Sequence, residues 1–199
     1  MPEAQVLLPI STEKDLVRFH MDDPFAAAKF ASELKKRVKR LGCDTNRPVI
    51  LLCIGTDRST GDSLGPLVGT RLSQYRPNPF KVYGTLEQPV HATNLHETLD
   101  RIRAAHPESF IIAIDACLGC IENVGTVALG DGALKPGAGV KKDLPEVGDV
   151  HVTGVVNVGG FLEYLVLQNT RLNLVMRLAN IIVSGLKQFA VEHYRKARA

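Results

Sequence analysis

The sequence predicts an α/β fold: a doubly wound, mostly parallel sheet with helices on both faces, forming a three-layer sandwich. Two short apolar runs, at residues 48–54 and 110–116, are typical of strands that are buried on both faces. From residue 48 onward, segments with apolar residues at helical spacing separate the predicted strands. Strands that alternate with helices need crossover connections, and these produce parallel strand pairs covered by helices.

Start and stop signals place the individual elements. A helix begins after Asp22-Asp23-Pro24, where an acidic cap and a proline suit the first turn, and Gly42 ends it. Pro77 ends the helix that follows the first central strand, and Thr93-Asn94 caps the next helix. The expected helices are 24–41, 63–75, 93–106, a short helix from 161, and 171–196; the expected strands are 47–55, 80–86, a strand ending at 115, 125–129, and 147–156.

One domain accounts for the chain. A length of 199 residues favours a single core. Residues 1–21 are mixed in composition and are expected to form an N-terminal arm or a short strand, so the predicted peptidase-like α/β domain spans residues 22–199. The glycine-rich segment at 130–147 is expected to hold a hairpin or a lid over the cleft.

Composition excludes several classes of protein. With 45% hydrophobic and 23% charged residues, the chain is ordinary for a globular protein, which argues against disorder. The net charge is only +3, and the basic clusters at residues 35–40 and 195–198 suit the last turns of helices, so nucleic acid is not an expected partner. No signal peptide and no apolar run of about 18 residues is visible, so we expect a cytoplasmic protein without a membrane segment.

Four cysteines fit a reducing compartment, and two of them form a Cys-x-x-Cys motif at Cys117 and Cys120. A zinc site normally needs four ligands, and neither a second such motif nor paired histidines follow. A redox motif of the thioredoxin type should open a helix, whereas Gly119 and the β-branched residues after it favour a loop and a strand. We therefore expect no metal and no cofactor, with a redox or zinc site as the less favoured alternative.

Two aspartates follow the two apolar runs, and they are the main candidate site. Asp62 lies in the polar loop after residues 48–54, and Asp115 follows residues 110–114. Because parallel strands end at the same edge of a sheet, both carboxylates can reach one crevice. A close carboxylate pair can serve as general acid and base toward water or an amide, or bind a metal with a further ligand. Alternatively, Asp62 caps the next helix and Asp115 accepts backbone N–H groups.

Further polar residues are expected near this crevice. The loop at residues 55–61 precedes a helix and can cradle a phosphate, although it lacks both the P-loop ending and the dinucleotide-binding glycine pattern. Arg58 can clamp a carboxylate or a carbonyl of a substrate, and Asn157 follows a later strand toward the same edge. The histidines expected nearest to the cleft are His91, His96 and His151, each of which can equally be structural.

Three stretches give the chain a family resemblance. Residues 54–66, Ile-Gly-Thr-Asp-Arg-Ser-Thr-Gly-Asp-Ser-Leu-Gly-Pro, and 114–119, Ile-Asp-Ala-Cys-Leu-Gly, resemble the YyaC family of sporulation proteins, with support from residues 148–163. That family is similar to the spore germination protease and to the endopeptidases that mature nickel hydrogenases. The resemblance implies a sandwich of the hydrogenase-maturation-peptidase or phosphorylase/hydrolase type. It also implies that Asp62 and Asp115 match the two acids of those peptidases.

The resemblance also implies a function. It suggests a spore-associated endopeptidase that acts without a metal on protein or peptide substrates, with small spore proteins as candidates. Asp62 and Asp115 would be catalytic, and Arg58, Asp57 and Asn157 would bind the substrate. Asn157 stands where the hydrogenase peptidases have a metal-sensing histidine, which argues against nickel-guided cleavage. A catalytically silent module that binds a peptide or partner is the alternative, and a homo-oligomer is left open.

Overall fold

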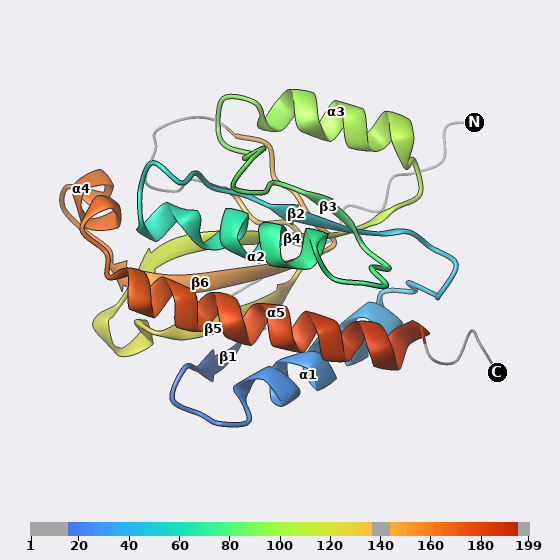
Figure 1. Ribbon diagram of the computed structural model, residues 1–199, viewed down its shortest axis with the longest axis horizontal. Helices are drawn as coiled ribbons and strands as arrows, with labels where there is room; N and C mark the ends of the chain where they lie inside the picture. Colours follow the sequence, from blue (N-terminus) through green and yellow to red (C-terminus); the bar gives the residue numbers. More distant parts are fainter. Residues whose placement is uncertain (1–15, 137–143, 195–199) are drawn as a thin grey trace.

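The computed structural model describes residues 16–136 and 144–194 of the chain. A six-stranded mixed sheet lies between two layers of helices, so the predicted α/β three-layer sandwich is confirmed (Figure 1). The strand order across the sheet is β1-β5-β6-β4-β2-β3. The strands are β1 Val17–His20, β2 Val49–Cys53, β3 Lys81–Tyr83, β4 Phe110–Gly119, β5 Thr126–Asp131 and β6 Val150–Val158. The helices are α1 Ala26–Arg40, α2 Leu64–Ser73, α3 Leu95–Ala105, α4 Glu163–Gln168 and α5 Leu172–Tyr194, with 3-10 turns η2 Gly61–Ser63 and η3 Ile121–Asn123.

The centre of the sheet is parallel, as predicted. Strands β3, β2, β4 and β6 run side by side in one direction, and all five residues of β2 are buried. On the other side of the sheet, β5 pairs antiparallel with both of its neighbours, β6 and β1. An antiparallel bridge between Leu134 and Val147 extends the β5–β6 connection, which fits the expected hairpin, while residues 137–143 lie outside the described part of the chain.

The sheet begins earlier than the predicted domain does. Val17–His20 form β1, an edge strand whose four residues pair with Thr126–Leu129 of β5. Phe19 points into the core, where its ring meets that of Phe30 edge to face at 5.8 Å between ring centroids. The described end of the expected arm is therefore a strand of the domain, and the domain starts before residue 22. Residues 1–15 lie outside the described residues.

Side-chain alternation divides the core into two clusters, one on each face of the sheet. Leu51, Ile112 and Val152 pack in one cluster with residues of α1, α2 and α5, whereas Ile50, Leu52 and Ala113 pack in the other with residues of α3. Figure 1 shows these helices on the two sides of the sheet. Neighbouring residues of a strand point to opposite faces, so continuous apolar strands supply both clusters. Consequently, residues 111, 113 and 115 of β4 share the face that carries α3.

The strand that leads to Asp115 is longer than predicted. The sequence suggested that it ends at the aspartate, but β4 continues for four more residues to Gly119. The reason is its partner: β6 pairs with β4 as far as Gly119 and Val158, with a register shift after Cys117. Asp115 is therefore a strand residue near the carboxyl edge, one position beyond the end of β2, whose Cys53 pairs with Ile114.

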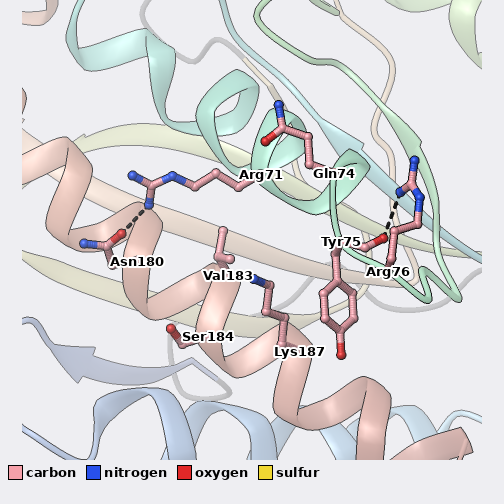
Figure 2. Close-up of a pocket in the computed structure, with 8 residues that line it drawn as sticks. All are labelled: Arg71, Gln74, Tyr75, Arg76, Asn180, Val183, Ser184 and Lys187. Atoms are coloured by element: carbon pink, nitrogen blue, oxygen red, sulfur yellow. Dashed lines mark hydrogen bonds between the residues drawn. The ribbon is translucent and has the colours of Figure 1, made fainter.

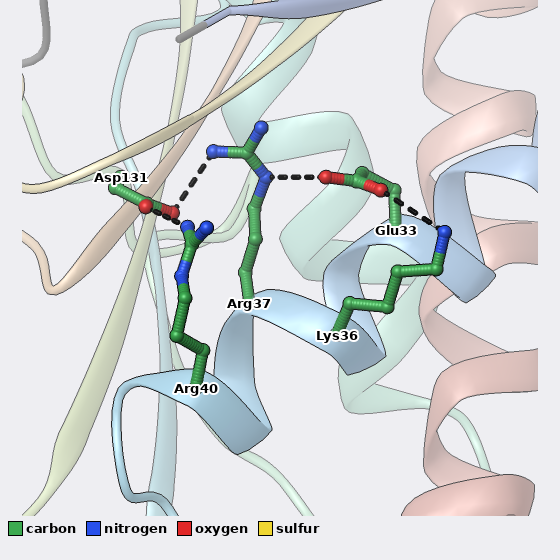
Figure 3. A network of polar contacts seen from close by, with 5 residues as sticks. All are labelled: Glu33, Lys36, Arg37, Arg40 and Asp131. Carbon is green, nitrogen blue, oxygen red and sulfur yellow. Dashed lines mark hydrogen bonds and ion pairs between the residues drawn. The ribbon is translucent and has the colours of Figure 1, made fainter.

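An ion-pair network attaches α1 to the antiparallel side of the sheet (Figure 3). Arg37 is 5% exposed, and its guanidinium donates to Glu33 at 3.0 Å and to Asp131 of β5 at 2.9 Å. Arg40 also contacts the Asp131 carboxylate, and Lys36 lies 3.6 Å from Glu33. A buried guanidinium is stable only when carboxylates surround it, so this network fixes how α1 packs on β5.

The last helix, α5, is long and apolar. It has 23 residues, and an 18-residue window with a mean hydropathy of 1.4 meets the length and composition of a membrane span. By length and apolar composition, the expectation that no segment is long enough to span a membrane is therefore wrong. Core helices pass the same test, and half of the window is buried inside the fold, where Leu178, Ile182 and Leu186 belong to the core that faces α1 and α2.

Candidate functional site

The loop after β2 folds back on itself and thereby positions Asp62. Gly55 adopts a φ of +136° and donates its N–H to the carbonyl of Val90 at 2.8 Å. The next N–H, of Thr56, donates to the carbonyl of Asp62 at 3.1 Å, which closes the loop. A Cβ added at Gly55 would lie 2.0 Å from that same carbonyl oxygen, so only glycine allows this approach.

Asp62 lies in η2 and is half-buried. Burial raises the pKa of its carboxyl above the usual value, while the backbone N–H of Thr56 and the nearby His91 act in the opposite direction. The alternative role as a helix cap is wrong, because Ser63 is the N-cap residue of α2 and no side chain caps that helix. The carboxyl group is thus not committed to the helix terminus and stands beside an imidazole.

Asp115 is buried in β4, with 5% of its surface exposed. Its Oδ1 accepts the N–H of Ala116 at 2.8 Å, which agrees with the expected bond to a backbone N–H group, although the residue lies in a strand and not in a loop. Across the sheet it pairs with Thr153 of β6. Asp115 therefore belongs to the face of the sheet that carries α3, at the carboxyl side of β4.

The structure brings the two segments that carry the aspartates together. The turn η2, with Asp62, packs against β4, with Asp115. The backbone link between them is short, because the N–H of Ile54 donates to the carbonyl of Ile114 at 2.7 Å and the loop starts at Gly55. His91 joins this edge, since Val90 forms a parallel bridge with Ile54. Residues 62, 91 and 115 thus come to one edge of the sheet from three separate segments.

Two of the expected substrate-binding residues lie on the outside of the loop. The side chains of Asp57 and Arg58 are exposed, and the N–H of Arg58 donates to Oγ1 of Thr56 at 3.3 Å. Ser59 differs from them, because it is 7% exposed and its hydroxyl has no hydrogen-bond partner in the described part of the protein. Sequence reasoning did not single out Ser59, since no local pattern distinguishes a buried serine in a polar loop.

Asn157 is held by bonds within the protein. Its Nδ2 donates to Oγ1 of Thr170 at 3.2 Å, and its Oδ1 accepts the N–H of Val158 at 2.9 Å. Thr170 in turn packs against the loop, because a Cβ at Gly61 would lie 3.0 Å from its Oγ1. Asn157 therefore reaches the candidate edge through Thr170, whereas the sequence suggested direct contact with substrate or carboxylate.

The other histidines lie elsewhere in the fold. His151 is buried in β6, its Nδ1 lies 3.0 Å from the carbonyl oxygen of Gly132, and burial lowers its pKa. His96 is exposed on α3. His91, in contrast, lies near enough to Asp62 to lower the pKa of that carboxyl, against the effect of burial.

The Cys-x-x-Cys motif spans the end of β4. Burial raises the pKa of the Cys117 thiol to about 11, while a hydrogen bond with the Thr153 side chain lowers it slightly. Cys117 is therefore a neutral thiol at neutral pH, unlike a reactive or metal-binding thiolate. Cys120 is exposed, and all four cysteines are unpaired. Within residues 16–136 and 144–194, no group of three or more His, Cys, Asp or Glu side chains could hold a metal ion.

Two grooves lie away from the aspartates. One is lined by residues of α2 and α5, among them Arg71, Tyr75 and Lys187 (Figure 2). The other, around Asp44 and Arg47, lies at the segment that enters β2 from its amino side. Neither groove includes Asp62 or Asp115, so the candidate site rests on the carboxyl edge itself.

Comparisons with known proteins identify the family of the chain. Residues 18–185 match a family described as "Protein of unknown function (DUF1256)". A Bacillus subtilis (strain 168) protein described as "Uncharacterized protein YyaC" is 52% identical over 176 residues, which are 88% of this chain and 84% of that protein. The solved structure of the NiFe hydrogenase maturation protease HycI from Thermococcus kodakarensis has a TM-score of 0.48 at 17% identity, covering 78% of this chain and 99% of that one.

Proposed function

The chain belongs to the DUF1256 family, together with YyaC, and we propose that it is a peptidase whose catalytic groups are Asp62 and Asp115. The observation that supports this proposal is the packing of η2 against β4, which brings together the two chain-distant segments that carry Asp62 and Asp115. The family resemblance seen in residues 54–66 and 114–119 implies the same two acids. The proposed substrate is a protein or peptide of the sporulating cell, with small spore proteins as the first candidates.

The two carboxyl groups have different environments, and this difference suggests their roles. Burial favours the protonated form of Asp62, and the nearby His91 can stabilise the carboxylate that proton transfer leaves there, so Asp62 is the proposed general acid. Asp115 is the proposed general base, which takes a proton from water as the water oxygen attacks the scissile carbonyl carbon. When the C–N bond breaks, the proton of Asp62 goes to the leaving amine. The carboxylate on Asp62 and the carboxyl on Asp115 then return to their starting states by exchange with solvent.

The surrounding residues have supporting roles in this proposal. Arg58 and Asp57 are exposed on the loop next to η2, where they can bind the polar backbone of an extended substrate. Asn157 acts as a positioning residue, because its bond to Thr170 supports the segment that packs on Gly61, the neighbour of Asp62. His91 stabilises the charged form of Asp62 after proton transfer.

Incubation with a spore-protein extract tests the proposal. Wild type, Asp62→Asn and Asp115→Asn are compared, and fragments are identified by mass spectrometry. Each aspartate variant is expected to stay folded and to lose cleavage. The matched control is Asp100→Asn on α3, whose side chain is 77% exposed. Cleavage that persists in both site variants, or that disappears equally in the control, would exclude the aspartate pair.

A second candidate function is a catalytically silent module that binds a peptide or partner. An exposed apolar cluster at residues 158–172, next to the segment that packs on η2, favours it; Phe161 is 88% exposed and Tyr164 is 68% exposed. A spore peptide captured by wild type and by the Asp62→Asn/Asp115→Asn double variant alike, without fragments in either case, would support this function over the peptidase.

A further inference from the structure

Three basic side chains line the groove between α2 and α5 (Figure 2). Arg71 and Arg76 come from α2 and the segment after it, and Lys187 comes from α5. The groove has a volume of about 490 Å³, and among the described residues none of those that line it is acidic. Pockets of about 300–1,000 Å³ are typical of small-molecule sites.

The polar contacts of these cations are with neutral groups. Arg71 donates to the amide oxygen of Asn180 and lies 3.9 Å from the sulfur of Met176. Arg76 donates to two backbone carbonyls, at 2.6 and 2.8 Å. The ammonium of Lys187 lies 5.0 Å from the centre of the Tyr75 ring.

Several cations elsewhere in the chain are placed differently. Arg37, Arg40 and Arg177 each contact a carboxylate. In the groove, basic side chains from α2, the segment after it and α5 lie together, and no carboxylate is among the described residues that line it. Bonds to charged acceptors are roughly twice as strong as bonds to neutral ones, so an incoming anion would replace the Asn180 contact of Arg71 favourably.

We propose that this groove binds a phosphate-bearing anion. A phosphate group accepts several hydrogen bonds at once, and the groove offers a guanidinium from α2 together with an ammonium, the amide of Asn180 and the hydroxyl of Ser184 from α5. Tyr75, under Lys187, adds an aromatic surface beside the charges. This site lies on the face of α2 and α5, away from Asp62 and Asp115, and it is independent of the proposed peptidase function.

Calorimetric titration of the whole protein with inorganic pyrophosphate tests the proposal. Binding is expected for wild type, and Arg71→Gln or Lys187→Gln should weaken it about tenfold, the effect of losing one charge-assisted hydrogen bond. The matched control is Arg101→Gln, which removes an exposed arginine of α3 in the opposite layer and should leave the dissociation constant unchanged. Amide resonances of α2 and α5 should shift on titration, and those of α3 should not.

Further arms separate the sources of phosphate and the competing ligands. Phosphatidylglycerol vesicles are tested with wild type and with Lys187→Gln, at pyrophosphate concentrations too low to compete for the groove. Vesicle binding to wild type but not to Lys187→Gln would identify a lipid headgroup as the source of the phosphate. If Arg71→Gln fails to fold, the affinity of Lys187→Gln for pyrophosphate and the amide resonance shifts of wild type test the proposal. The proposal is wrong if pyrophosphate does not bind at millimolar concentration, if Arg101→Gln weakens binding equally, or if an acidic peptide without phosphate binds this groove more tightly than pyrophosphate does.

Discussion

Replacing Gly55 by alanine should displace Asp62 without changing any carboxylate. The added Cβ would lie 2.0 Å from the carbonyl oxygen of Asp62 and 3.2 Å from Cδ of Pro66. Side-chain carbons do not approach a backbone oxygen so closely, so η2 must move away from the loop. Because η2 carries Asp62 and packs on β4, the shift separates the two proposed catalytic groups.

The expected loss of unfolding free energy has two parts, backbone strain and overpacking, and a substitution at Gly160 measures the first part alone. Gly55 has a φ of +136° and Gly160 a φ of +143°, so alanine is strained in both backbones by about 1–3 kcal/mol. An added Cβ meets nothing within 4 Å at Gly160, so Gly160→Ala carries only this term. Gly55→Ala adds overpacking of about 1–3 kcal/mol, so its total cost in unfolding free energy is about 2–6 kcal/mol.

Urea denaturation of both variants measures the difference, provided that their m-values match that of wild type. In the cleavage assay, Gly160→Ala should keep activity and Gly55→Ala should lose it, even at a temperature where both are folded. Equal losses of stability in the two variants would show that the contact between Gly55 and Asp62 is not tight. Full activity of Gly55→Ala would show that the position of η2 does not matter for cleavage.

Three further predictions concern charge. Burial raises the pKa of Asp62 in the folded protein. The stability that the protonated carboxyl contributes is therefore fully present below the unfolded-state pKa of about 3.9, and it is lost as the pH rises through the folded-state pKa. Asp62→Asn should therefore match wild type in unfolding free energy at acid pH and exceed it at neutral pH; a deficit at neutral pH would contradict this. Asp131→Asn should lower the unfolding free energy by about 3 kcal/mol in the same assay, because Asp131 pairs with Arg37, whose side chain is 6% exposed. The exposed pair of Asp100 with Arg103 should contribute less than about 1 kcal/mol. Cleavage should survive chelation with EDTA, and loss that an added divalent metal reverses would contradict an aspartate-pair mechanism without metal.

Local patterns were sufficient to predict most of the fold. The apolar run before Gly55 is β2, buried along its whole length, and the helical stripe from residue 24 is α1, with Phe30, Leu34 and Val38 in the core. These elements follow from periodicity, which depends only on neighbouring residues. The reversed direction of β5 was not predicted, because strand direction depends on the connection to β6 and not on the composition of either strand.

The candidate site was predictable only in part, for a related reason. The rule that parallel strands end together predicts that the segments carrying Asp62 and Asp115 meet at one edge, and η2 does pack on β4. The length of β4 beyond Asp115 depends on its pairing with β6, which no pattern within residues 110–119 reveals. Thr153 stands beside Asp115 through the same pairing, so it too needed the register of the sheet.

Asn157 illustrates the limit most clearly. The sequence places an amide at the end of a strand on the correct edge, and this much the structure supports. Its side chain, however, bonds to Thr170, a residue beyond α4, and Thr170 packs on Gly61, more than a hundred positions earlier in the sequence. Strand ends indicate which residues reach an edge, but which of them face substrate depends on what packs beside them. In this protein the segment after α4 occupies that place, so Asn157 serves the turn that carries Asp62 and does not itself line the site.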